Sequence, residues 1–418
     1  MKNRFVAILL VSVLLLSGAF LGAGSSNAYA RQKSSKTKAK SSAKKRSKGR
    51  TIRASAKRRG GSKWTARRVA ARRRAAAYRR IALARARAVD QSLLHTVQKH
   101  ILEDDPTGED EEMRNVAIEA LGSNPGTVVI MDPNNGHIYS IVNQQWAIGK
   151  PVKPCSTIKL ITSIAALTEG IVDPDVPLEI SGGADINMID ALARSNNEYF
   201  QELGEQLGFE QVINYAREWG LGELTGINME GESPGYVPTY KAPRAVPRMC
   251  SHGDDIGITA VQLAVLTAAI ANGGYIYQPQ VLRTEEDVNN FKPILVRKVD
   301  IAEKDREKII EGMLGAVTYG TAKRSAVATL NVAGKTGSCN GAESKLGLFA
   351  SFSSPTNPEL VVVVISTGSI QRGSLTSIMA GEIYSKLSHR FGKTERPRRV
   401  TPASEPIEPS QNSSNVNQ

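Results

Sequence analysis

A serine and a lysine stand three residues apart in PCSTIKL, residues 154–160, ahead of an apolar segment that ends at Gly170. Residues i and i+3 of a helix are neighbours on its surface, so Lys159 is within reach of the Ser156 hydroxyl. A serine needs such a base to become a good nucleophile, and a first helical turn offers free N–H groups to an oxyanion. The pair therefore predicts acyl transfer, although S-x-x-K also occurs as a capping serine beside a surface lysine.

Two polar elements further along the chain suit the same chemistry. Ser195-Asn196-Asn197 lies between two helical patterns, where short polar groups can point into a cleft. Lys335-Thr336-Gly337-Ser338 lies on a predicted strand, where Gly337 would let a ligand approach the backbone closely. In this order the three elements resemble the S-x-x-K, S-x-N and K-T-G signature of penicillin-binding proteins and class A β-lactamases.

The resemblance to this superfamily extends over residues 115–390. The segments GELTGINMEGESPGYVP (222–238) and IGITAVQLAVLTAAIANGG (256–274) are similar to segments of penicillin-binding transpeptidases. So are DALARSNNEYF (190–200) and TVVIMDPNNGHIYSIVN (127–143). These segments favour the transpeptidase branch of the superfamily over the β-lactamase branch.

The resemblance implies a peptidoglycan D,D-transpeptidase, which cross-links the cell wall through a serine acyl-enzyme and binds penicillin covalently. Ser156 would attack the D-Ala-D-Ala carbonyl of a stem peptide. Lys159 would be its general base, neutral because burial and cationic neighbours lower its pKa. Ser195 would relay the proton to the leaving amine. The resemblance implies no metal and no organic cofactor, and the five histidines lack zinc-ligand spacing.

The resemblance also assigns the substrate-binding residues. Asn197 would hold the substrate amide. Lys335 and Thr336 would bind the terminal carboxylate, for which an ammonium and a hydroxyl are suitable donors. Gly337 and Ser338 continue this strand, and the backbone N–H groups of Ser338 and of the nucleophile would form the oxyanion hole. The implied partners are peptidoglycan stem peptides and β-lactam antibiotics.

The residue before the nucleophile departs from the family pattern. Many transpeptidases have glycine there, whereas this chain has Cys155. Family geometry puts the nucleophile beside the K-T-G strand, where Cys339 follows Ser338. The resemblance therefore implies a Cys155–Cys339 disulfide, similar to that of some carbapenem-hydrolysing class A β-lactamases. Two separate thiols are the alternative, and Cys250 is the odd cysteine in either case.

The first residues have the features of an export segment. Lys2 and Arg4, an apolar run over residues 5–24 and an Ala28-Tyr29-Ala30 ending predict a signal peptide over residues 1–30 or a retained membrane anchor. The remainder would then lie in the cell envelope or periplasm, where disulfides persist.

Residues 31–90 form a basic arm in which Asp90 is the single acidic residue, so the net charge of +14 combines this arm with an acidic remainder. Residues 31–60 are predicted to be disordered. Residues 64–89 contain enough Ala and Arg to become helical on an anionic surface. We interpret the arm as binding an anionic envelope surface, either phospholipid or wall polymer, with a solvated spacer as the alternative. Export, and the lack of an aromatic-interleaved basic surface, argue against nucleic acid.

Strand patterns at both ends and helical patterns between them predict an α+β domain over residues 91–391, followed by a disordered tail over residues 392–418. An antiparallel sheet of N- and C-terminal hairpins would be backed by a helical subdomain, as in the β-lactamase and transpeptidase folds. Helices are expected at 156–168, 187–194, 197–207, 209–218, 259–271 and 374–387, and strands within 126–142 and at 329–337, 345–352 and 359–367.

Three other functions remain open at this point. A D,D-carboxypeptidase would share the acyl-enzyme and pass it to water. A serine β-lactamase would need an activated water, and no E-x-x-x-N element follows Ser195 where class A enzymes place the deacylating glutamate. A non-catalytic penicillin-binding sensor would be acylated without turnover.

Overall fold

The computed structural model describes residues 57–180, 184–240, 246–327, 330–341 and 344–391. The expected leader, the arm up to residue 56 and the tail from residue 392 lie outside these residues.

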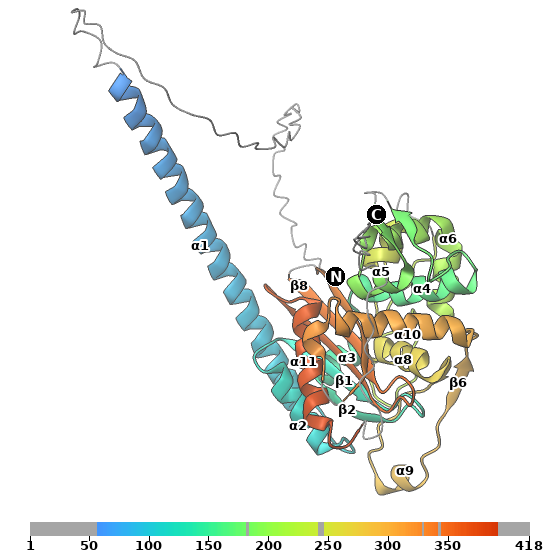
Figure 1. The fold of residues 1–418 in the computed structure, drawn as a ribbon. Helices are drawn as coiled ribbons and strands as arrows, with labels where there is room; N and C mark the ends of the chain where they lie inside the picture. Colours follow the sequence, from blue (N-terminus) through green and yellow to red (C-terminus); the bar gives the residue numbers. More distant parts are fainter. Residues whose placement is uncertain (1–56, 181–183, 241–245, 328–329, 342–343, 392–418) are drawn as a thin grey trace, which may run out of the picture. The chain divides into compact units, whose positions relative to one another are not determined.

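A five-stranded antiparallel sheet forms the centre of the domain, in the strand order β2-β1-β9-β8-β7 (Figure 1). Its strands are β1 (Gly126–Met131), β2 (Ile138–Val142), β7 (Val332–Asn340), β8 (Lys345–Ser353) and β9 (Val361–Gly368). The N-terminal hairpin joins the C-terminal strands because β1 pairs with β9. This arrangement confirms the α+β fold with a sheet built from both ends of the domain.

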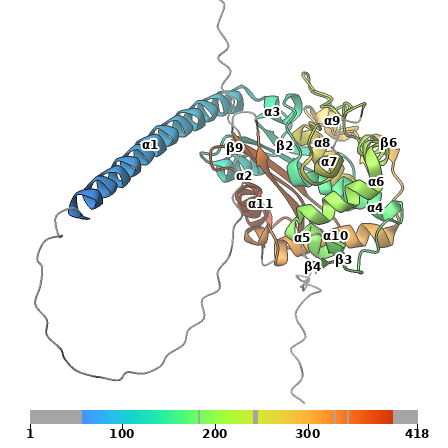
Figure 2. The same cartoon turned by 90° about the horizontal axis from the view of Figure 1, so that it is seen from above.

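Both faces of the sheet are buried, which explains the almost continuous apolar sequence of its strands. Side chains alternate between the faces: along β9, Val361 and Val363 pack into one core, and Val362 and Val364 pack into the other. Figure 2 shows helices on both sides of the sheet. Among the helices that contact it are α2 (Glu111–Leu121) and α11 (Gly373–Leu387) on the Val362 face, and α8 (Ala260–Asn272) on the Val361 face.

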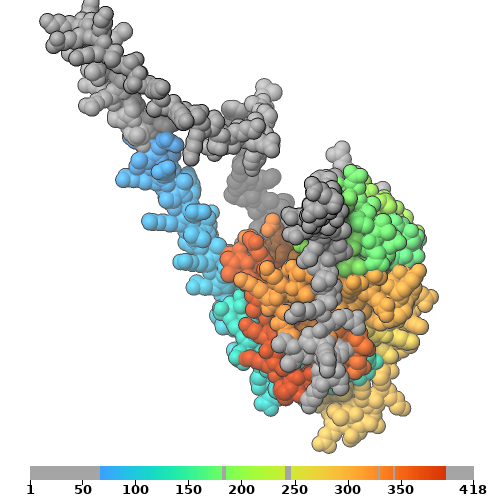
Figure 3. Space-filling model, in the orientation of Figure 1, coloured from blue at the N-terminus to red at the C-terminus, as the bar shows by residue number. Residues whose placement is uncertain are grey.

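The helical region lies between β2 and β7 in the sequence, and much of it forms the green surface in Figure 3. Besides α8 it contains α4 (Lys159–Thr168), α5 (Met188–Arg194), α6 (Asn197–Glu218), α7 (Val246–His252) and α10 (Glu303–Thr318). Gly208, at φ +75°, interrupts α6 at the position where two separate helices were predicted. The predicted helices in the α5, α8 and α11 segments are also confirmed, with ends that differ by one residue.

Helix α1 (Lys57–Glu103) includes residues 64–89, which were predicted to become helical. It starts within the range expected to be disordered, since residues 57–60 are its first turn. It also continues past Asp90, whose carboxylate accepts hydrogen bonds from the backbone N–H and the hydroxyl of Ser369. The expected domain boundary at residue 90 therefore falls inside a continuous helix. No helix in the described ranges is both long enough and apolar enough to cross a bilayer.

The segment between α1 and β1 is held to the sheet by a buried ion network. Arg114 in α2 donates to Asp104 at 2.9 Å and to Glu109 at 3.0 Å. Asp104 also accepts hydrogen bonds from the backbone N–H groups of Asn143 and Gln144, which follow β2. Burial raises the pKa of Asp104 although these hydrogen bonds act to lower it. The end of α1 is thus part of the packing of the catalytic domain.

Several elements were not identified from the sequence, among them α2 and α10. The others are short, so their patterns cover too few residues to stand out. They are α3 (Gln144–Gly149), η1 (Cys155–Ile158), β3 (Leu178–Ile180), β4 (Ala184–Ile186), α7 (Val246–His252), β5 (Tyr275–Tyr277), α9 (Glu285–Asn289), β6 (Leu295–Lys298) and η2 (Lys323–Ser325).

Candidate active site

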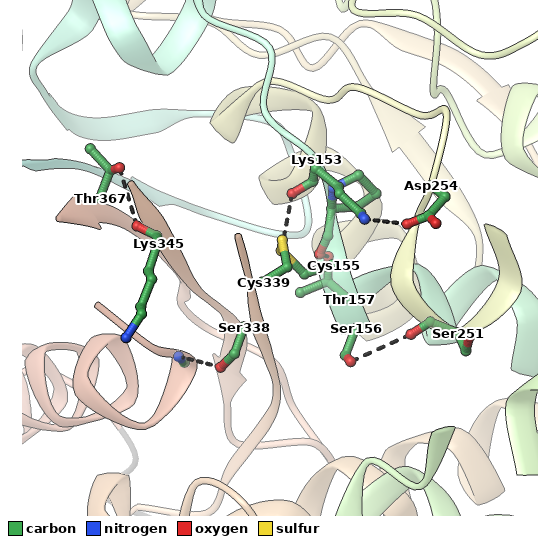
Figure 4. The surroundings of a disulfide bond; sticks show 12 residues. Lys153, Cys155, Ser156, Thr157, Ser251, Asp254, Ser338, Cys339, Lys345 and Thr367 are labelled. Carbon is green, nitrogen blue, oxygen red and sulfur yellow. Dashed lines mark hydrogen bonds and ion pairs between the residues drawn. A yellow bond between two sulfur atoms is a disulfide. The ribbon is translucent and has the colours of Figure 1, made fainter. Parts of the chain in front are cut away.

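The Ser156 turn, residues 155–158, precedes α4. An α-helix was expected to start at Ser156, but these residues form a 3-10 turn and α4 starts at Lys159. Residues i and i+3 of a 3-10 turn lie almost above one another, and Lys159 Nζ donates to Ser156 Oγ at 3.3 Å. The Ser156 hydroxyl also faces the carbonyl oxygen of Ser251 at 3.5 Å (Figure 4). The serine is therefore close to a base, as predicted, within a tighter turn than expected.

Cys155 forms a disulfide with Cys339, which confirms the predicted pairing (Figure 4). The two Cα atoms are 5.6 Å apart although 184 positions separate the residues in the sequence. Cys155 has φ +52°, in the left-handed region that favours glycine. The covalent link to β7 holds this residue in a conformation that a glycine would adopt without strain.

Gly337 lets β7 lie directly against the Ser156 turn. A Cβ atom at this position would be 3.1 Å from the carbonyl oxygen of Pro154 and 3.3 Å from Cγ2 of Thr157. This glycine was predicted to let a ligand approach the backbone. In the structure, the atoms that crowd it belong to Pro154 and Thr157 of the adjoining turn and to Leu348 in β8. Gly337 and the disulfide together place the backbones of the two catalytic motifs side by side.

Lys159 has no exposed surface, and its ammonium has several polar neighbours. Nζ lies 2.9 Å from the carbonyl oxygen of Ser195, 3.1 Å from Ser195 Oγ and 2.7 Å from Asn197 Oδ1. Burial, and then the charge of Lys335, lower the pKa of Lys159 to about 6. A lysine with this pKa is largely neutral at neutral pH, as a general base must be.

Lys335 is also fully buried. Its Nζ donates to Ser195 Oγ at 2.8 Å and to the carbonyl oxygen of Thr336 at 3.1 Å. Burial lowers its pKa to about 7. The Ser195 hydroxyl therefore links the lysine of the first motif to the lysine of the third.

The Ser195 turn joins two helices. Ser195 ends α5 in the left-handed conformation, at φ +56°, and Asn196 caps α6 by accepting a hydrogen bond from the backbone N–H of Tyr199. The reversal between these helices points Ser195 Oγ and Asn197 Oδ1 toward the same ammonium, that of Lys159. Two helix ends thus position the second motif.

The side chains of Thr336 and Ser338 contact neighbouring segments. Thr336 Oγ1 lies 2.7 Å from Thr321 Oγ1, in the loop after α10. Ser338 Oγ accepts a hydrogen bond from the backbone N–H of Gly373 at 2.8 Å (Figure 4). The structure therefore places all eight predicted catalytic and substrate-binding residues on the Ser156 turn and the first residue of α4, on the turn between α5 and α6 and the first residue of α6, or on β7.

Helix α7 and the loop after it support the site in a way that the sequence did not predict. Ser251 supplies the carbonyl that faces Ser156. Asp254 binds Lys153, just before the Ser156 turn, and accepts a hydrogen bond from Arg248 at 2.7 Å (Figure 4). Partial burial acts to raise the pKa of Asp254, but these two cations outweigh it and lower the pKa. Thr321 was also missed, and no local pattern marks any of these residues.

The site has the parts that acyl transfer requires: a serine, a lysine of lowered pKa, a hydroxyl between two ammonium groups and a nearby strand edge. Among the residues that the structure describes, no group of three or more His, Cys, Asp or Glu side chains could hold a metal ion.

Comparison with known proteins gives a match over most of the domain. Residues 126–388 match the family model of the penicillin binding protein transpeptidase domain. Stage V sporulation protein D of Bacillus subtilis is 27% identical over 59% of this chain and 46% of its own length. Peptidoglycan D,D-transpeptidase MrdA of Acinetobacter baumannii is 24% identical over 68% of this chain and 54% of its own length. The chain therefore spans about half the length of these curated relatives.

Solved structures share the fold. Pseudomonas aeruginosa PBP2, in complex with WCK 5153, has a TM-score of 0.61 and 20% identity, and the match covers 68% of this chain and 77% of that one. The transpeptidase domain of Burkholderia pseudomallei penicillin-binding protein 3 has a TM-score of 0.60 and 19% identity, covering 68% of this chain and 96% of that one. At these identities the likeness shows a common fold.

Proposed function

This chain belongs to the penicillin-binding protein transpeptidase family, and from that premise we propose that it is a serine-type peptidoglycan D,D-transpeptidase. It would cross-link stem peptides that end in D-Ala-D-Ala through a serine acyl-enzyme, and β-lactam antibiotics would acylate the same serine. The observation that carries this proposal is the convergence of two buried lysines on the Ser195 hydroxyl beside Ser156.

In the first step, Ser156 Oγ bonds to the penultimate D-Ala carbonyl carbon while neutral Lys159 takes the hydroxyl proton. The peptide C–N bond then breaks, and the proton reaches the leaving D-Ala amine through Ser195, which accepts a hydrogen bond from Lys159. In the second step, an amine of another stem peptide attacks the ester carbonyl and releases Ser156. Lys159, neutral again after the first step, takes a proton from this attacking amine, and the same proton passes to the departing Ser156 oxygen.

The remaining residues would bind the substrate. We assign the terminal carboxylate to Lys335 and Thr336, because a cation and a hydroxyl on one strand give a charge-assisted contact. Asn197 would hold the substrate amide. The backbone N–H groups of Ser156 and Ser338 would receive the oxyanion, supported by the close approach of β7 to the Ser156 turn.

The experiment that tests this function is intact-mass spectrometry of the protein with benzylpenicillin, followed for about an hour beside a Ser156→Ala variant. We expect one lasting penicillin adduct, absent from the variant. Rapid loss of the antibiotic without an adduct would favour a β-lactamase. No adduct and no hydrolysis would refute the proposed chemistry of Ser156.

A second measurement separates the two fates of the acyl-enzyme. A D-Ala-D-Ala pentapeptide is incubated with and without an acceptor peptide that carries a free amine, and the products are weighed by mass spectrometry. A transpeptidase gives a linked dimer, whereas a carboxypeptidase gives the shortened peptide alone. Acylation without either product would favour a sensor.

We further propose that the protein is exported to the cell envelope and that residues 31–90 hold it on an anionic surface there. The sequence of α1 contains no Asp or Glu before Asp90, so the arginines between Arg67 and Arg87 give this part of the helix a net positive charge, which supports electrostatic binding. Deletion of residues 31–88 should release the protein from membrane or wall fractions at low salt. Unchanged partitioning would contradict a binding role for the arm.

A further inference from the structure

Two neighbouring cavities share Trp146 and Lys150 in their walls. The first, of about 670 Å³, lies between the end of α1, helix α3 and the loop at residues 229–231. The second, of about 490 Å³, lies between α3, the residues before the Ser156 turn and the adjoining ends of β7 and β8. Each is in the size range of ligand sites. Because they share these two side chains, we treat them together as the Trp146 groove.

Trp146 lies in the walls of both cavities, and the Lys150 ammonium lies over its ring. The indole is half-buried, Lys150 Nζ lies 3.5 Å from the ring centroid, and the ring of His100 meets it edge-on at 6.4 Å. Tyr236, which is 55% exposed, supplies a second ring in the wall of the second cavity. Aromatic rings with one apolar face and a polar surround suit ligands that are themselves apolar on one face and hydrogen-bonding at the rim.

The floor of the first cavity is rigid. Gln144 Nε2 donates to the carbonyl oxygen of Asp105 at 2.7 Å and to Glu109 at 2.8 Å, and its Oε1 accepts from the Asp105 N–H. Asp104 is bound by Arg114. Groups that are already bonded to the protein give the cavity a fixed shape, which lowers the entropic cost of binding.

The walls of the two cavities carry charges of both signs, with Glu103, Asp104 and Glu230 in the first, Lys150 in both and Lys153 in the second. Gln145 and Glu230 are exposed beside the first cavity, and Asn340 is exposed beside the second. A strongly charged polymer would meet repulsion from the charges of its own sign, whereas a neutral ligand with many hydroxyl and amide groups would be accepted by both cavities.

The groove ends close to the catalytic motifs. Lys153 in its wall is three residues before Ser156, and Asn340 is two residues after Ser338. Three residues span at most about 10 Å, and a stem peptide of about five residues spans at most about 17 Å. A saccharide in the groove is therefore within the reach of a stem peptide from Ser156.

We propose that the Trp146 groove binds the N-acetylated sugar backbone of a peptidoglycan strand, as a second site for the substrate of the proposed transpeptidase. Pyranose rings have one face of C–H groups, which would lie against the indole, and a rim of hydroxyl and acetamido groups, which would meet Gln145, Glu230 and Asn340. The proposal rests on the proposed function for the identity of the polymer and on the groove for its position.

The test is a fluorescence titration of the full chain with the N-acetylglucosamine tetramer. The chain has three tryptophans, and Trp219 is buried, so a change that disappears in Trp146→Phe reports on the groove. We expect saturable binding that Trp146→Ala weakens at least about tenfold and that Gln145→Ala, at an exposed position, also weakens. No saturable change, or the same change in Trp146→Phe, would overturn the proposal.

A second measurement ties the groove to catalysis. Trp146→Ala should lower the cross-linking rate on polymeric peptidoglycan strands at least about tenfold more than the rate on a short free peptide. An equal loss on both substrates would overturn the proposal, since it would indicate damage to the site. If the native protein binds the tetramer and cross-links neither substrate, the proposed function fails while the saccharide site stands.

Discussion

Lys159 and Lys335 donate to the same oxygen atom, Ser195 Oγ, at 3.1 and 2.8 Å. Neither lysine side chain is exposed to solvent. Two ammonium groups at one hydroxyl repel each other, and burial disfavours both charges. The arrangement therefore favours a state in which one lysine is neutral and the other is charged, which are the states that a base and a carboxylate-binding group require.

The pH dependence of acylation should reflect both lysines. Its second-order rate should rise as the pH rises through about 6, because Lys159 loses its proton and becomes a base. The rate should fall as the pH rises through about 7, because Lys335 loses the charge that binds the carboxylate. Stopped-flow measurement of benzylpenicillin acylation across this pH range should give a narrow, bell-shaped dependence of the acylation rate on pH.

The matched variant for that profile is Lys335→Arg. A guanidinium remains charged throughout the range, so the falling limb should disappear while the rising limb stays near pH 6. A falling limb that persists unchanged in this variant would show that Lys335 does not cause it.

Ser195→Ala should lower the acylation rate by about 10² to 10⁴, the usual contribution of a positioned proton-transfer group. The variant removes the oxygen that both lysines share and leaves Asn196 to cap α6. Asn196→Ala is the control, because it removes a cap worth about 1 kcal/mol of stability and keeps the hydroxyl. Thermal unfolding and acylation rates measured together would separate the two effects, and equal rate losses in both variants would argue against a proton relay.

The sequence could predict the parts of this protein that depend on local pattern. Some elements can be identified from a hydrophobic periodicity or a turn sequence within the segment itself. They are the hairpin at residues 126–142, the buried strands near the C-terminus and the helix after Ser195. Lys159, Lys335 and Ser195 were identifiable because they stand in short motifs at fixed spacings. Their convergence on one hydroxyl depended on the fold, which the resemblance supplied.

The missed features depend on contacts between distant segments. Arg114 looks like an ordinary charge on an amphipathic helix, and only its burial against Asp104 and Glu109 shows that it holds the N-terminal segment in place. Thr321 and Ser251 lie in segments without a distinctive sequence pattern. They belong to the site because Thr321 contacts Thr336 on the strand and the Ser251 carbonyl faces Ser156 on the turn. Gly337 was noticed, but the surface that it approaches could not be read from a one-dimensional pattern.

Loss of the disulfide should destabilise the protein and disturb the Ser156 turn. Closing a loop across 184 positions is worth about 5 kcal/mol in the chain-entropy model. Cys339→Ala should therefore lower the free energy of unfolding by up to about that amount. Chemical denaturation with and without reductant checks this, because reductant should destabilise the native protein and leave the variant unchanged.

A second variant separates the loss of the cross-link from backbone strain. Cys155→Gly in the Cys339→Ala background replaces a residue at φ +52° by one that adopts this conformation freely. We expect it to recover about 1 kcal/mol and part of the acylation rate. No recovery would mean that the left-handed conformation of Cys155 is not a source of strain.

Arg114→Met should destabilise the protein by about 3 to 5 kcal/mol, because it leaves the carboxylates of Asp104 and Glu109 buried without their cation. Lys386→Met is the control, since Lys386 pairs with Glu119 at the surface and should contribute less than about 1 kcal/mol. Urea unfolding of both variants gives the comparison. Similar losses in the two would contradict a structural role for the buried network.

Asp254→Asn should slow acylation by about tenfold with little loss of stability, because Asp254 connects the residue before the Ser156 turn to α7. Without the charge, Lys153 is free to move, and the turn can shift relative to the Ser251 carbonyl that faces Ser156. Displacements of an ångström or less cost this much in catalysis. Asp175→Asn removes a comparable partner of Lys308 at an exposed position and serves as the control. Acylation rates measured at saturating and at limiting benzylpenicillin would show whether the loss lies in the chemical step, as we expect. A native acylation rate in Asp254→Asn would mean that the disulfide and Gly337 suffice to hold the turn.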